Sequence, residues 1–431
     1  MNEPLAVREA PASYQVMLDA QRIRPGYKQT EVGVIPEDWD ALPLSAITSE
    51  IGDGLHGTPT YSSNGTYFFI NGNNLRDGKL VVTEETKTVD QSEFAKNRKN
   101  LGDRSILMSI NGTIGNLGLF DGEAVVLGKS AAYLNVKNGV SKLFVYHSLQ
   151  TEIVRGQFLD GLTGSTIGNL GLATIRNTRV PLPPTLEEQR AIAAALSDVD
   201  ALLAKLDQLI AKKRDLKQAV MQQLLTGSTR LPGFSGEWEV KRLGEVATFY
   251  KGKGLPKSAI SSFGAEPCIH YGELFTRYPE TISDILSRTD TSRGTFRSVA
   301  NDVLMPTSDV TPRGLAKASC VRADGVILGG DILVIRSDTK LIFGSFLSYL
   351  IRYEEEQVLQ FVTGSTVFHL YGSDMKKFTL SMPSLPEQTA IATILSDMDT
   401  EIAALEARRD KTRDLKQGMM HELLTGNIRL I

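Results

Sequence analysis

The stretch LEEQRAIAAALSDVD, from Leu186 to Asp200, returns as LPEQTAIATILSDMD, from Leu385 to Asp399. A second repeated pair follows at the same offset of 199 positions, because LKQAVMQQLLTGSTRL begins at Leu216 and LKQGMMHELLTGNIRL begins at Leu415. Roughly half of the chain is therefore an internal duplication, and a duplication of this length predicts two similar structural units.

The repeated stretches have the features of long helices. Each begins with a hydroxyl and a carboxylate three positions apart, the spacing of a capping box, at Thr185 and Glu188 and at Ser384 and Glu387. Gly227 and Gly426 end the pattern. Each helix should therefore have about 40 residues and extend roughly 60 Å at 1.5 Å per residue.

Apolar residues recur on both helices at alternating spacings of four and three, which predicts a coiled-coil seam. The seam residues are Ile192, Leu196, Val199, Leu203 and Leu206 in the first copy, and Ile391, Leu395, Met398, Ile402 and Leu405 in the second. The seam is interrupted where the continued heptad would place Lys213 and Lys217, or Arg409 and Lys416, so we expect the stripe to shift to Leu216 and Leu415. The helices should bury their stripes on each other as an antiparallel pair with pseudo-two-fold symmetry.

Each helix follows a β-rich stretch, and the offset of 199 pairs Trp39 with Trp238 where these two stretches begin. Strands are expected at Thr66 to Asn71, Ser105 to Ile110, Val125 to Gly128 and Ala132 to Val136, and in the second copy at Pro267 to Tyr271, Asn301 to Thr307 and Gly325 to Ser337. A closing helix is expected at Leu143 to Phe158 and at Ile342 to Phe361. The predicted fold class is α/β (α+β), with two β-rich domains in tandem, each followed by a long helix.

The predicted segments are an N-terminal extension over residues 1–32, a β-rich domain over 33–182, a helical spacer over 183–228, a second β-rich domain over 229–382 and a C-terminal helical spacer over 383–431. A short helix is expected around Gln15 to Arg22 in the extension.

The composition is that of an ordinary globular protein, with 431 residues, 41% hydrophobic and 23% charged. Since 47 basic and 50 acidic side chains give a net charge of -3, a nucleic-acid surface would have to be a local patch. Cys268 and Cys320 are too few for a disulfide framework. No apolar run approaches the ~18 residues of a membrane helix, and the first residues lack a signal-peptide pattern, so we expect a cytoplasmic protein without a membrane partner.

Motifs for catalysis are missing from the sequence. It has neither the Asn/Asp-Pro-Pro-aromatic loop and Gly-rich turn of amino-methyltransferases nor metal-ligand spacing among its histidines, at positions 56, 147, 270, 369 and 421. GEAVVLGKS, from Gly122 to Ser130, imitates a phosphate loop, but five residues rather than four separate its glycines. We therefore predict no catalytic residue, no metal and no cofactor.

Several further stretches are family markers, and they occur in order along the chain: GVIPEDW (Gly33 to Trp39), TGST at Thr163 and Thr363, PLPPTLEEQRAI (Pro181 to Ile192), PSLPEQTAI (Pro383 to Ile391) and LLTGSTRLPGF (Leu224 to Phe234). In these stretches the chain resembles the DNA-specificity subunit of type I restriction-modification systems. The resemblance covers all but Met1 to Tyr27. It implies that the β-rich domains are target recognition domains, each reading half of a split site in double-stranded DNA. It also implies that the helices dock two adenine-methylating modification subunits, that restriction subunits join the complex, and that this subunit has no chemistry of its own.

Side chains that can contact DNA gather in loops. The first candidate is the loop after the Thr66 strand, with Asn71, Asn73, Asn74, Arg76 and Lys79, among which Asn73, Asn74 and Arg76 are the expected base readers. Its positional counterpart holds His270, Tyr271 and Arg277. The other candidates, several of them for phosphate, are Asn111, Thr113, Lys129, Arg293, Arg297, Ser308, Arg313 and Lys317. Plain turns remain the alternative for the asparagine loops, and turn capping by hydroxyls remains the alternative for the TGST segments.

Two basic stretches lie on the helices, at Lys212 to Lys217 and Arg408 to Lys416. They fit a solvated face, a docking surface for the modification subunits, or phosphate contacts across the spacer. If the helix pair acts as a ruler, four residues inserted within Leu202 to Leu209 would add about 6 Å and lengthen the gap between unchanged half-sites. The competing hypothesis is a non-enzymatic coiled-coil scaffold whose β-rich domains bind protein or carbohydrate, and it predicts no retention on duplex DNA.

Overall fold

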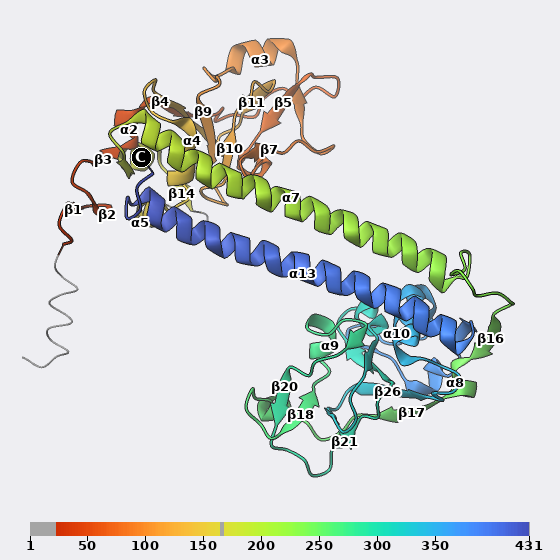
Figure 1. The fold of residues 1–431 in the computed structure, drawn as a ribbon. Coiled ribbons are helices and arrows are strands. Elements are labelled where there is room, and N and C mark those ends of the chain that lie inside the picture. The colour runs from red at the N-terminus through yellow and green to blue at the C-terminus, as the bar shows by residue number, and fades with distance from the viewer. Residues whose placement is uncertain (1–22, 164–167, 431) are drawn as a thin grey trace, which may run out of the picture. The chain divides into compact units, whose positions relative to one another are not determined.

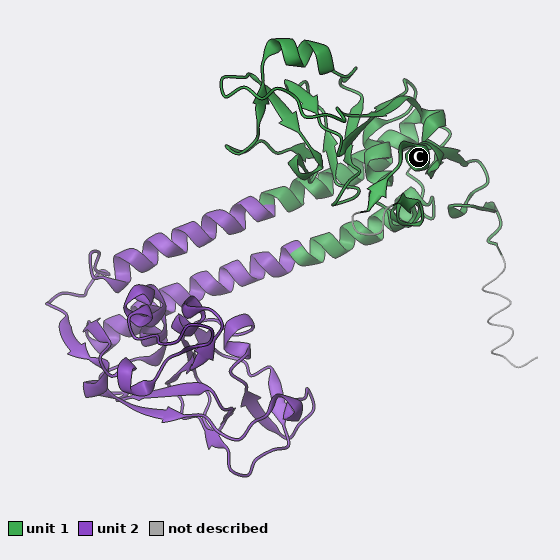
Figure 2. Cartoon of the chain, turned by 180° about the vertical axis from the view of Figure 1, so that it is seen from behind, with its two compact units in different colours: residues 1–205, 410–431 green, residues 206–409 purple. Residues whose placement is uncertain are grey.

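The computed structural model describes residues 23–163 and 168–430, and it divides into two compact units (Figures 1 and 2). Unit 1 contains residues 1–205 and 410–431, and unit 2 contains residues 206–409. Two 40-residue helices, α7 (Leu186–Leu225) and α13 (Leu385–Leu424), each contribute a segment to both units. The predicted order of two mixed α/β domains, each followed by a long helix, is confirmed. The helix expected around Gln15 to Arg22 lies outside the described residues.

Over its described residues, the β-rich domain of unit 1 is built from short strands, five short α-helices and one 3-10 turn. Its strands are β1 (Tyr27–Thr30), β2 (Gly33–Pro36), β3 (Asp40–Pro43), β4 (Thr48–Asp53), β5 (Tyr67–Ile70), β6 (Leu75–Arg76), β7 (Lys79–Leu80), β8 (Thr88–Val89), β9 (Ser105–Ser109), β10 (Leu117–Leu119), β11 (Val125–Leu127), β12 (Ala131–Val136), β13 (Leu162–Thr163), β14 (Asn169–Leu170) and β15 (Arg179–Leu182). Its helices are α2 (Leu44–Ile47), η1 (Gly72–Asn74), α3 (Gln91–Asn97), α4 (Lys142–Ser148), α5 (Glu152–Asp160) and α6 (Leu172–Asn177).

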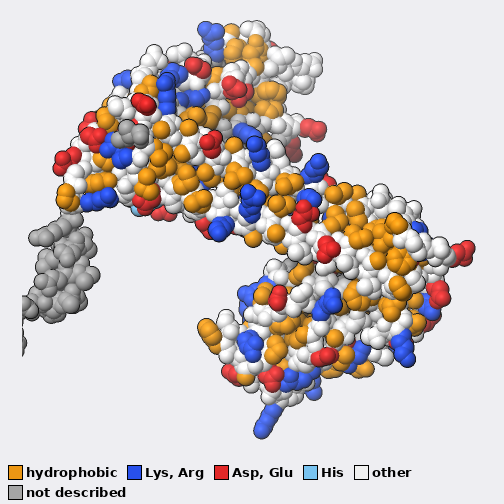
Figure 3. Space-filling model, viewed as in Figure 1, with side chains coloured by type: hydrophobic (Ala, Val, Ile, Leu, Met, Phe, Trp, Pro, Cys, Tyr) orange, Lys and Arg blue, Asp and Glu red, His pale blue; other side chains and the backbone are white. Residues whose placement is uncertain are grey.

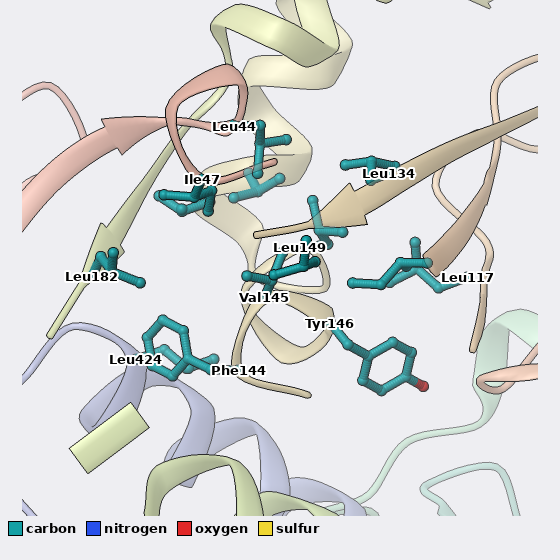
Figure 4. Close-up of a cluster of buried hydrophobic side chains, with 14 of the residues drawn as sticks. Leu44, Ile47, Leu117, Leu134, Phe144, Val145, Tyr146, Leu149, Leu182 and Leu424 are labelled. Carbon is teal, nitrogen blue, oxygen red and sulfur yellow. The ribbon is translucent and has the colours of Figure 1, made fainter. Parts of the chain in front are cut away.

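Two sheets organise this domain: an antiparallel sheet in the order β10-β9-β12-β4, and a smaller sheet in the order β11-β5-β8, in which β11 and β5 are parallel. Side chains alternate between faces along a strand. Ile106 of β9 therefore faces a core with Phe144 of α4, while Leu107 faces a second core with Ile70 of β5. Figure 4 shows Leu424 of α13 reaching the first core beside Phe144.

Unit 2 repeats this plan. Its strands are β16 (Glu239–Arg242), β17 (Ala247–Lys251), β18 (Glu266–Ile269), β19 (Thr281–Ile282), β20 (Ser287–Thr289), β21 (Phe296–Arg297), β22 (Asp302–Pro306), β23 (Ser308–Asp309), β24 (Ser319–Val321), β25 (Ile327–Leu328), β26 (Ile332–Ser337), β27 (Phe368–His369) and β28 (Thr379–Met382). Its helices are α8 (Leu243–Val246), η2 (Lys257–Ala259), α9 (Glu273–Thr276), η3 (Pro312–Ala316), α10 (Gly344–Tyr353), α11 (Glu355–Leu359) and α12 (Gly372–Met375). The sheets run β17-β26-β22-β24-β19 and β20-β18-β25-β21.

The closing helix expected in each domain is in fact two helices. In unit 1, α4 stops at Ser148 and α5 starts after Thr151, whose hydroxyl accepts a hydrogen bond from the amide of Val154 at 3.4 Å. In unit 2, Glu354 has φ -85° and ψ 35° and separates α10 from α11. Apolar periodicity continues through both breaks, which explains why the sequence pattern suggested one helix.

The long helices pack on each other inside each unit. In unit 1, Ile192 and Leu196 near the start of α7 share a core with Leu423 and Leu424 near the end of α13. In unit 2 the end of α7, with Leu224 and Leu225, shares a core with Ile391 and Leu395 near the start of α13. Start meets end in both cases, so the pairing is antiparallel, as predicted (Figure 1). Every predicted seam residue is buried or half-buried; Val199, Leu203, Met398 and Leu405 are the half-buried ones.

The predicted shift of the apolar stripe is wrong. Leu216 and Leu415 are 48% and 59% exposed. Lys217 and Lys416, which continue the strict heptad frame, have side chains only 14% and 13% exposed. The frame therefore continues unchanged, and the seam accepts charge at these two positions.

Carboxylates on the other helix explain why the seam tolerates lysine. Lys217 Nζ lies 2.5 Å from Asp399 Oδ1 in unit 2, and Lys416 Nζ lies 2.6 Å from Asp200 Oδ1 in unit 1. The lysine stem can pack along apolar surface while its ammonium group is compensated by the opposite charge.

The basic stretches on the helices also face acids of the opposite helix within unit 2. Lys213 pairs with Glu401, Arg214 with Glu406 and Arg409 with Asp207. These contacts give the stretches a role in helix pairing, which was not among the three interpretations of their sequence. Exposed pairs of this kind contribute about 0 to 1 kcal/mol each.

Candidate nucleic-acid interface

The loop after β5 is held by two of its own asparagines. The Asn71 amide donates to Asn74 Oδ1 at 3.0 Å, and Asn74 Nδ2 donates to the carbonyl of Val81 at 3.0 Å. Asn71 Oδ1 accepts from the Ser130 hydroxyl at 2.9 Å. These two asparagines are half-buried, while Asn73, Arg76 and Lys79 are exposed. Among the five candidates of this loop, Asn73, Arg76 and Lys79 are thus the most accessible to a ligand.

The loop after β18 is at the equivalent position in unit 2 but has a different conformation. His270, half-buried, accepts at Nδ1 from the Gly272 amide at 3.2 Å, and burial lowers the pKa of its imidazole. The buried Glu273 accepts from the Ser287 hydroxyl at 2.6 Å and pairs with Arg277 at 3.3 Å. A short helix, α9, therefore replaces the asparagine turn, with Tyr271 half-buried beside it.

A second pair of loops also differs between the units. Asn111 is half-buried and bridged to Asn169, and Thr113 is exposed between two glycines with positive φ. The corresponding segment of unit 2 starts with Ser308 in β23 and continues into η3. There Arg313 extends outward and pairs with two adjacent carboxylates of α11, Glu355 and Glu356.

The remaining basic candidates differ in their exposure and in their contacts. Lys129, which is distant in sequence from the loop after β5, lines a pocket with Asn71 of that loop. Arg297 donates to Glu266 at 3.1 Å and to the carbonyl of Gly325 at 2.8 Å. Arg293 is exposed and Lys317 is half-buried. On the face shown in Figure 3, lysines and arginines are interspersed with acidic side chains, so no uniform basic surface marks the interface there.

The helix junctions explain the repeated sequence motifs. In unit 2, Glu387 at the start of α13 is 1% exposed, and its two oxygens accept from Arg230 Nε and Nη2 at 2.6 Å each. The Arg230 guanidinium also lies over the indole of Trp238, with 5.8 Å from Cζ to the ring. A Cβ on Gly227 would stand 3.1 Å from that indole, which favours glycine here.

Unit 1 contains the same junction. Arg429 binds Glu188 at the start of α7 and donates to Asp38 at 3.0 Å, and its Cζ lies 5.6 Å from the indole of Trp39. These contacts with Glu188 and Asp38 raise the pKa of the Arg429 guanidinium. Of the predicted capping box, the hydroxyl half is present, because Thr185 accepts from the Glu188 amide at 3.2 Å. The carboxylate half is wrong, since Glu188 binds Arg429, which no local pattern could reveal.

A glutamine beside each of these glutamates ties the long helix to its recognition domain. Gln189 Oε1 accepts from the Ser141 amide at 2.9 Å, and Gln388 Oε1 accepts from the Phe343 amide at 3.0 Å. His147 lies six positions after Ser141, and Tyr349 lies six positions after Phe343. These two side chains are therefore structural counterparts.

Charged groups surround these counterparts at the seam. Tyr349 donates to Asp399 at 2.6 Å, and Lys217 bridges Asp399 and Glu280. Burial would raise the pKa of Glu280, but Arg352 and Lys217 bring it below its usual value. In unit 1, His147 Nε2 lies 3.1 Å from the Ser197 hydroxyl. Burial lowers the pKa of His147 to about 4, and the imidazole is neutral at pH 7.

The two units also differ at one exposed position outside the predicted candidates. SSNG, from Ser62 to Gly65, precedes β5, and SSFG, from Ser261 to Gly264, precedes β18, again 199 positions apart. Both Asn64 and Phe263 are exposed, and Phe263 is 96% exposed. The repeated offset would have revealed the pair.

Within residues 23–163 and 168–430, no helix is long and apolar enough to cross a membrane, and no three His, Cys, Asp or Glu side chains form a group that could hold a metal ion.

The fold agrees with what comparison with known proteins shows. The family described as "Type I restriction modification DNA specificity domain" matches residues 48–212 and 235–412. The chain belongs to this family, and the resemblance seen in its motifs is confirmed.

Individual specificity subunits are similar to this chain in sequence. The putative type I restriction enzyme MjaX specificity subunit of Methanocaldococcus jannaschii is 25% identical over 430 residues, covering 94% of this chain and 97% of the relative. The EcoKI specificity subunit of Escherichia coli is 24% identical over 216 residues, covering 45% of this chain and 44% of the relative.

Solved structures support the same fold. The type I restriction-modification S subunit from M. genitalium superposes with a TM-score of 0.60 at 16% identity, covering 90% of this chain and 96% of that one. A chain from a study of complex assembly and conformational transition of the type I R-M system superposes with a TM-score of 0.54 at 15% identity, covering 91% of this chain and 99% of that one.

Proposed function

We propose that this specificity subunit gives a type I restriction-modification complex its target sequence, with each recognition domain reading one half of a split, asymmetric duplex site. The observation that carries the proposal is a contrast between the two units. The helix junctions repeat the same Glu, Arg and Trp side chains, whereas the loops after β5 and β18 differ in sequence and in fold. Like junctions hold the two long helices in the same way and so suit a common partner for both helices, and divergent loops suit two different half-sites.

In the first half-site, Asn73 and Arg76 read base edges, since amide and guanidinium groups can form paired hydrogen bonds with bases. Lys79, Thr113 and Lys129 contact phosphates. The half-buried Asn71, Asn74 and Asn111 hold the loops that present these groups.

In the second half-site, Tyr271 and Arg277 flank the α9 turn that takes the place of the asparagine loop. His270 and Ser308 support the loops, and the basic side chains Arg293, Arg297, Arg313 and Lys317 contact phosphates. Those of Arg297 and Arg313 would exchange an internal carboxylate partner for phosphate.

The paired helices dock two copies of an adenine-methylating modification subunit, and restriction subunits join that complex. The chain itself supplies recognition and no catalysis. Two copies follow from the duplicated helices, because equivalent surfaces bind equivalent partners.

Co-expression with the modification subunit, followed by sequencing of methylated bases across the host genome, tests the proposal. The expected result is one methylated motif with two unlike halves and a fixed gap. A chain in which residues 33–182 replace residues 229–382 should then methylate a motif with two like halves. Methylation without a split motif, or no retention on duplex DNA by the assembled complex, would contradict the proposal.

A further inference from the structure

The loops that precede β5 and β18 form matching tips with unlike side chains. Asn64 projects from one and Phe263 from the other, at identical positions in the repeat. Single apolar side chains on a surface are ordinary. A phenylalanine that is 96% exposed and held on a rigid loop is a different case, because its ring is presented to solvent without neighbours that cover it.

The unit 2 tip is held by hydrogen bonds on both sides. The amides of Phe263 and Gly264 donate to the Ser261 hydroxyl at 3.2 and 2.9 Å. The Arg288 guanidinium donates to the carbonyls of Gly264 and Ala265 at 2.5 and 2.6 Å. The Ala265 amide donates to Asp290 Oδ1 at 2.9 Å. The backbone is thus fixed before any ligand arrives, so ordering it on binding costs little entropy.

The glycine in each tip is required by close approach to a neighbouring strand. A Cβ on Gly264 would stand 2.4 Å from the amide nitrogen of Thr289, and a Cβ on Gly65 would stand 2.4 Å from the carbonyl of Val89. In unit 1 the Gly65 amide also donates to the carbonyl of Ser62 at 3.0 Å. In each unit, therefore, an equivalent loop packs against an equivalent edge strand, and only the side chain at the tip differs.

We infer that this tip is a DNA contact that distinguishes the two half-sites: Phe263 inserts as a wedge at a base step of the second half-site, and the Asn64 amide hydrogen-bonds to a base edge in the first. The inference rests on the proposed function. A phenyl ring has no hydrogen-bonding group, so it reads DNA through stacking and through the ease with which a step unstacks. An asparagine amide can pair with the N6 and N7 edge of adenine.

The divergence between the tips favours DNA over a protein partner. A surface that binds two copies of one subunit is expected to keep its side chains. The tips keep their serine and glycine scaffold and change the one side chain that is presented. That is the pattern expected where one loop meets two different sequences.

The test uses the full chain assembled with its modification subunits and the split motif that they methylate. Phe263→Ala should weaken binding about 10- to 100-fold, the contribution typical of one base stacked on an aromatic ring, or make one step of the second half-site degenerate. Val240→Ala removes another exposed apolar side chain of unit 2, in β16, and should change affinity by less than about twofold. Asn64→Ala should relax only the first half-site.

Fluorescence of 2-aminopurine, scanned through the second half-site, gives an independent readout. Wild-type protein should unstack the probe at one step, and Phe263→Ala should not. Unchanged affinity, motif and fluorescence in Phe263→Ala would overturn the inference, as would loss of modification-subunit assembly with DNA recognition intact. If the wild-type complex reads no split motif, the proposed function itself fails. If the wild-type complex reads the motif and Phe263→Ala reads it equally well, only the present inference fails.

Discussion

Arg230 and Glu387 are 157 positions apart in the sequence, yet two 2.6 Å hydrogen bonds join the guanidinium to both oxygens of the carboxylate. This contact ties the segment that follows α7 to the first turn of α13 within unit 2. The glutamate side chain is 1% exposed, so the pair replaces the water that this carboxylate would otherwise need.

Substitutions at this contact should destabilise unit 2 unequally. Glu387→Gln keeps the shape but loses the charge of the acceptor, and it should lower the free energy of unfolding by about 2 kcal/mol. Arg230→Ala should be the more damaging change, because it leaves a buried carboxylate without a partner. Urea unfolding followed by circular dichroism measures both. Arg313→Ala is the matched control, because Arg313 pairs with Glu355 at an exposed site and should cost less than about 1 kcal/mol. Equal losses for Arg230→Ala and Arg313→Ala would contradict the role assigned to the junction.

Because Lys217 lies in the seam and Leu216 does not, replacing the lysine should destabilise the chain more than replacing the leucine. Lys217→Ala should lower the free energy of unfolding by about 3 kcal/mol, because it removes the ammonium group that pairs with both Asp399 and Glu280, whose side chains are largely buried. Leu216→Ala, at a position 48% exposed, should cost less than about 1 kcal/mol. Urea unfolding of the two variants side by side decides the frame. A larger loss of unfolding free energy for Leu216→Ala than for Lys217→Ala would mean that the apolar stripe does shift to Leu216.

The buried imidazole of His147 predicts a dependence of stability on pH. Its pKa is about 4 in the folded chain, against an ordinary value near 6.5. Between these values the unfolded chain binds a proton that the folded chain does not, so stability falls as pH falls through this window. The loss from this group should be about 2 kcal/mol between pH 7 and pH 5. The groups that face the imidazole are Asp200, Lys416 and Ser197.

The matched variant is His147→Tyr, which installs the side chain that unit 2 carries at this place, Tyr349. Thermal unfolding from pH 5 to pH 7 should show a shallower slope for the variant than for the wild type. His270, whose pKa burial also lowers, contributes a remaining slope of the same sign. A slope that the variant leaves unchanged would mean that His147 is protonated in the folded chain.

The sequence predicted the helices well because their signals are local. Heptad spacing, a capping hydroxyl at Thr185 and stop glycines at Gly227 and Gly426 lie within the segments that they define. The shifted stripe failed because the carboxylates that accept Lys217 come from another helix and from a recognition domain. Apolar periodicity contains no information about such partners. It therefore assigns leucine rather than a neighbouring lysine to the seam.

The loops that hold the candidate DNA-contact residues show the same limit. Asn74 was expected to read bases because of its residue type, yet its side chain holds Val81 and the Asn71 amide. Asn71 accepts from Ser130, 59 positions away, which no local motif indicates. Asn64 and Phe263 were visible in the repeat but stood out only when their exposure was known. Residue type identifies candidates, and tertiary contacts decide which of them remain available to a ligand.

Asn73 and Asn74 are adjacent asparagines that should behave oppositely. Asn73 is exposed, so Asn73→Ala should leave the unfolding midpoint unchanged and weaken discrimination at one position of the first half-site by about 1 to 3 kcal/mol. Asn74→Ala should destabilise the loop, since it removes a hydrogen bond to the Val81 carbonyl and another from the Asn71 amide, at about 1 kcal/mol each. Methylated-motif sequencing of each variant complex, alongside urea unfolding of each chain, separates the two effects. If Asn73→Ala left the motif unchanged while Asn74→Ala altered one base without loss of stability, the assignment of reader and support would be reversed.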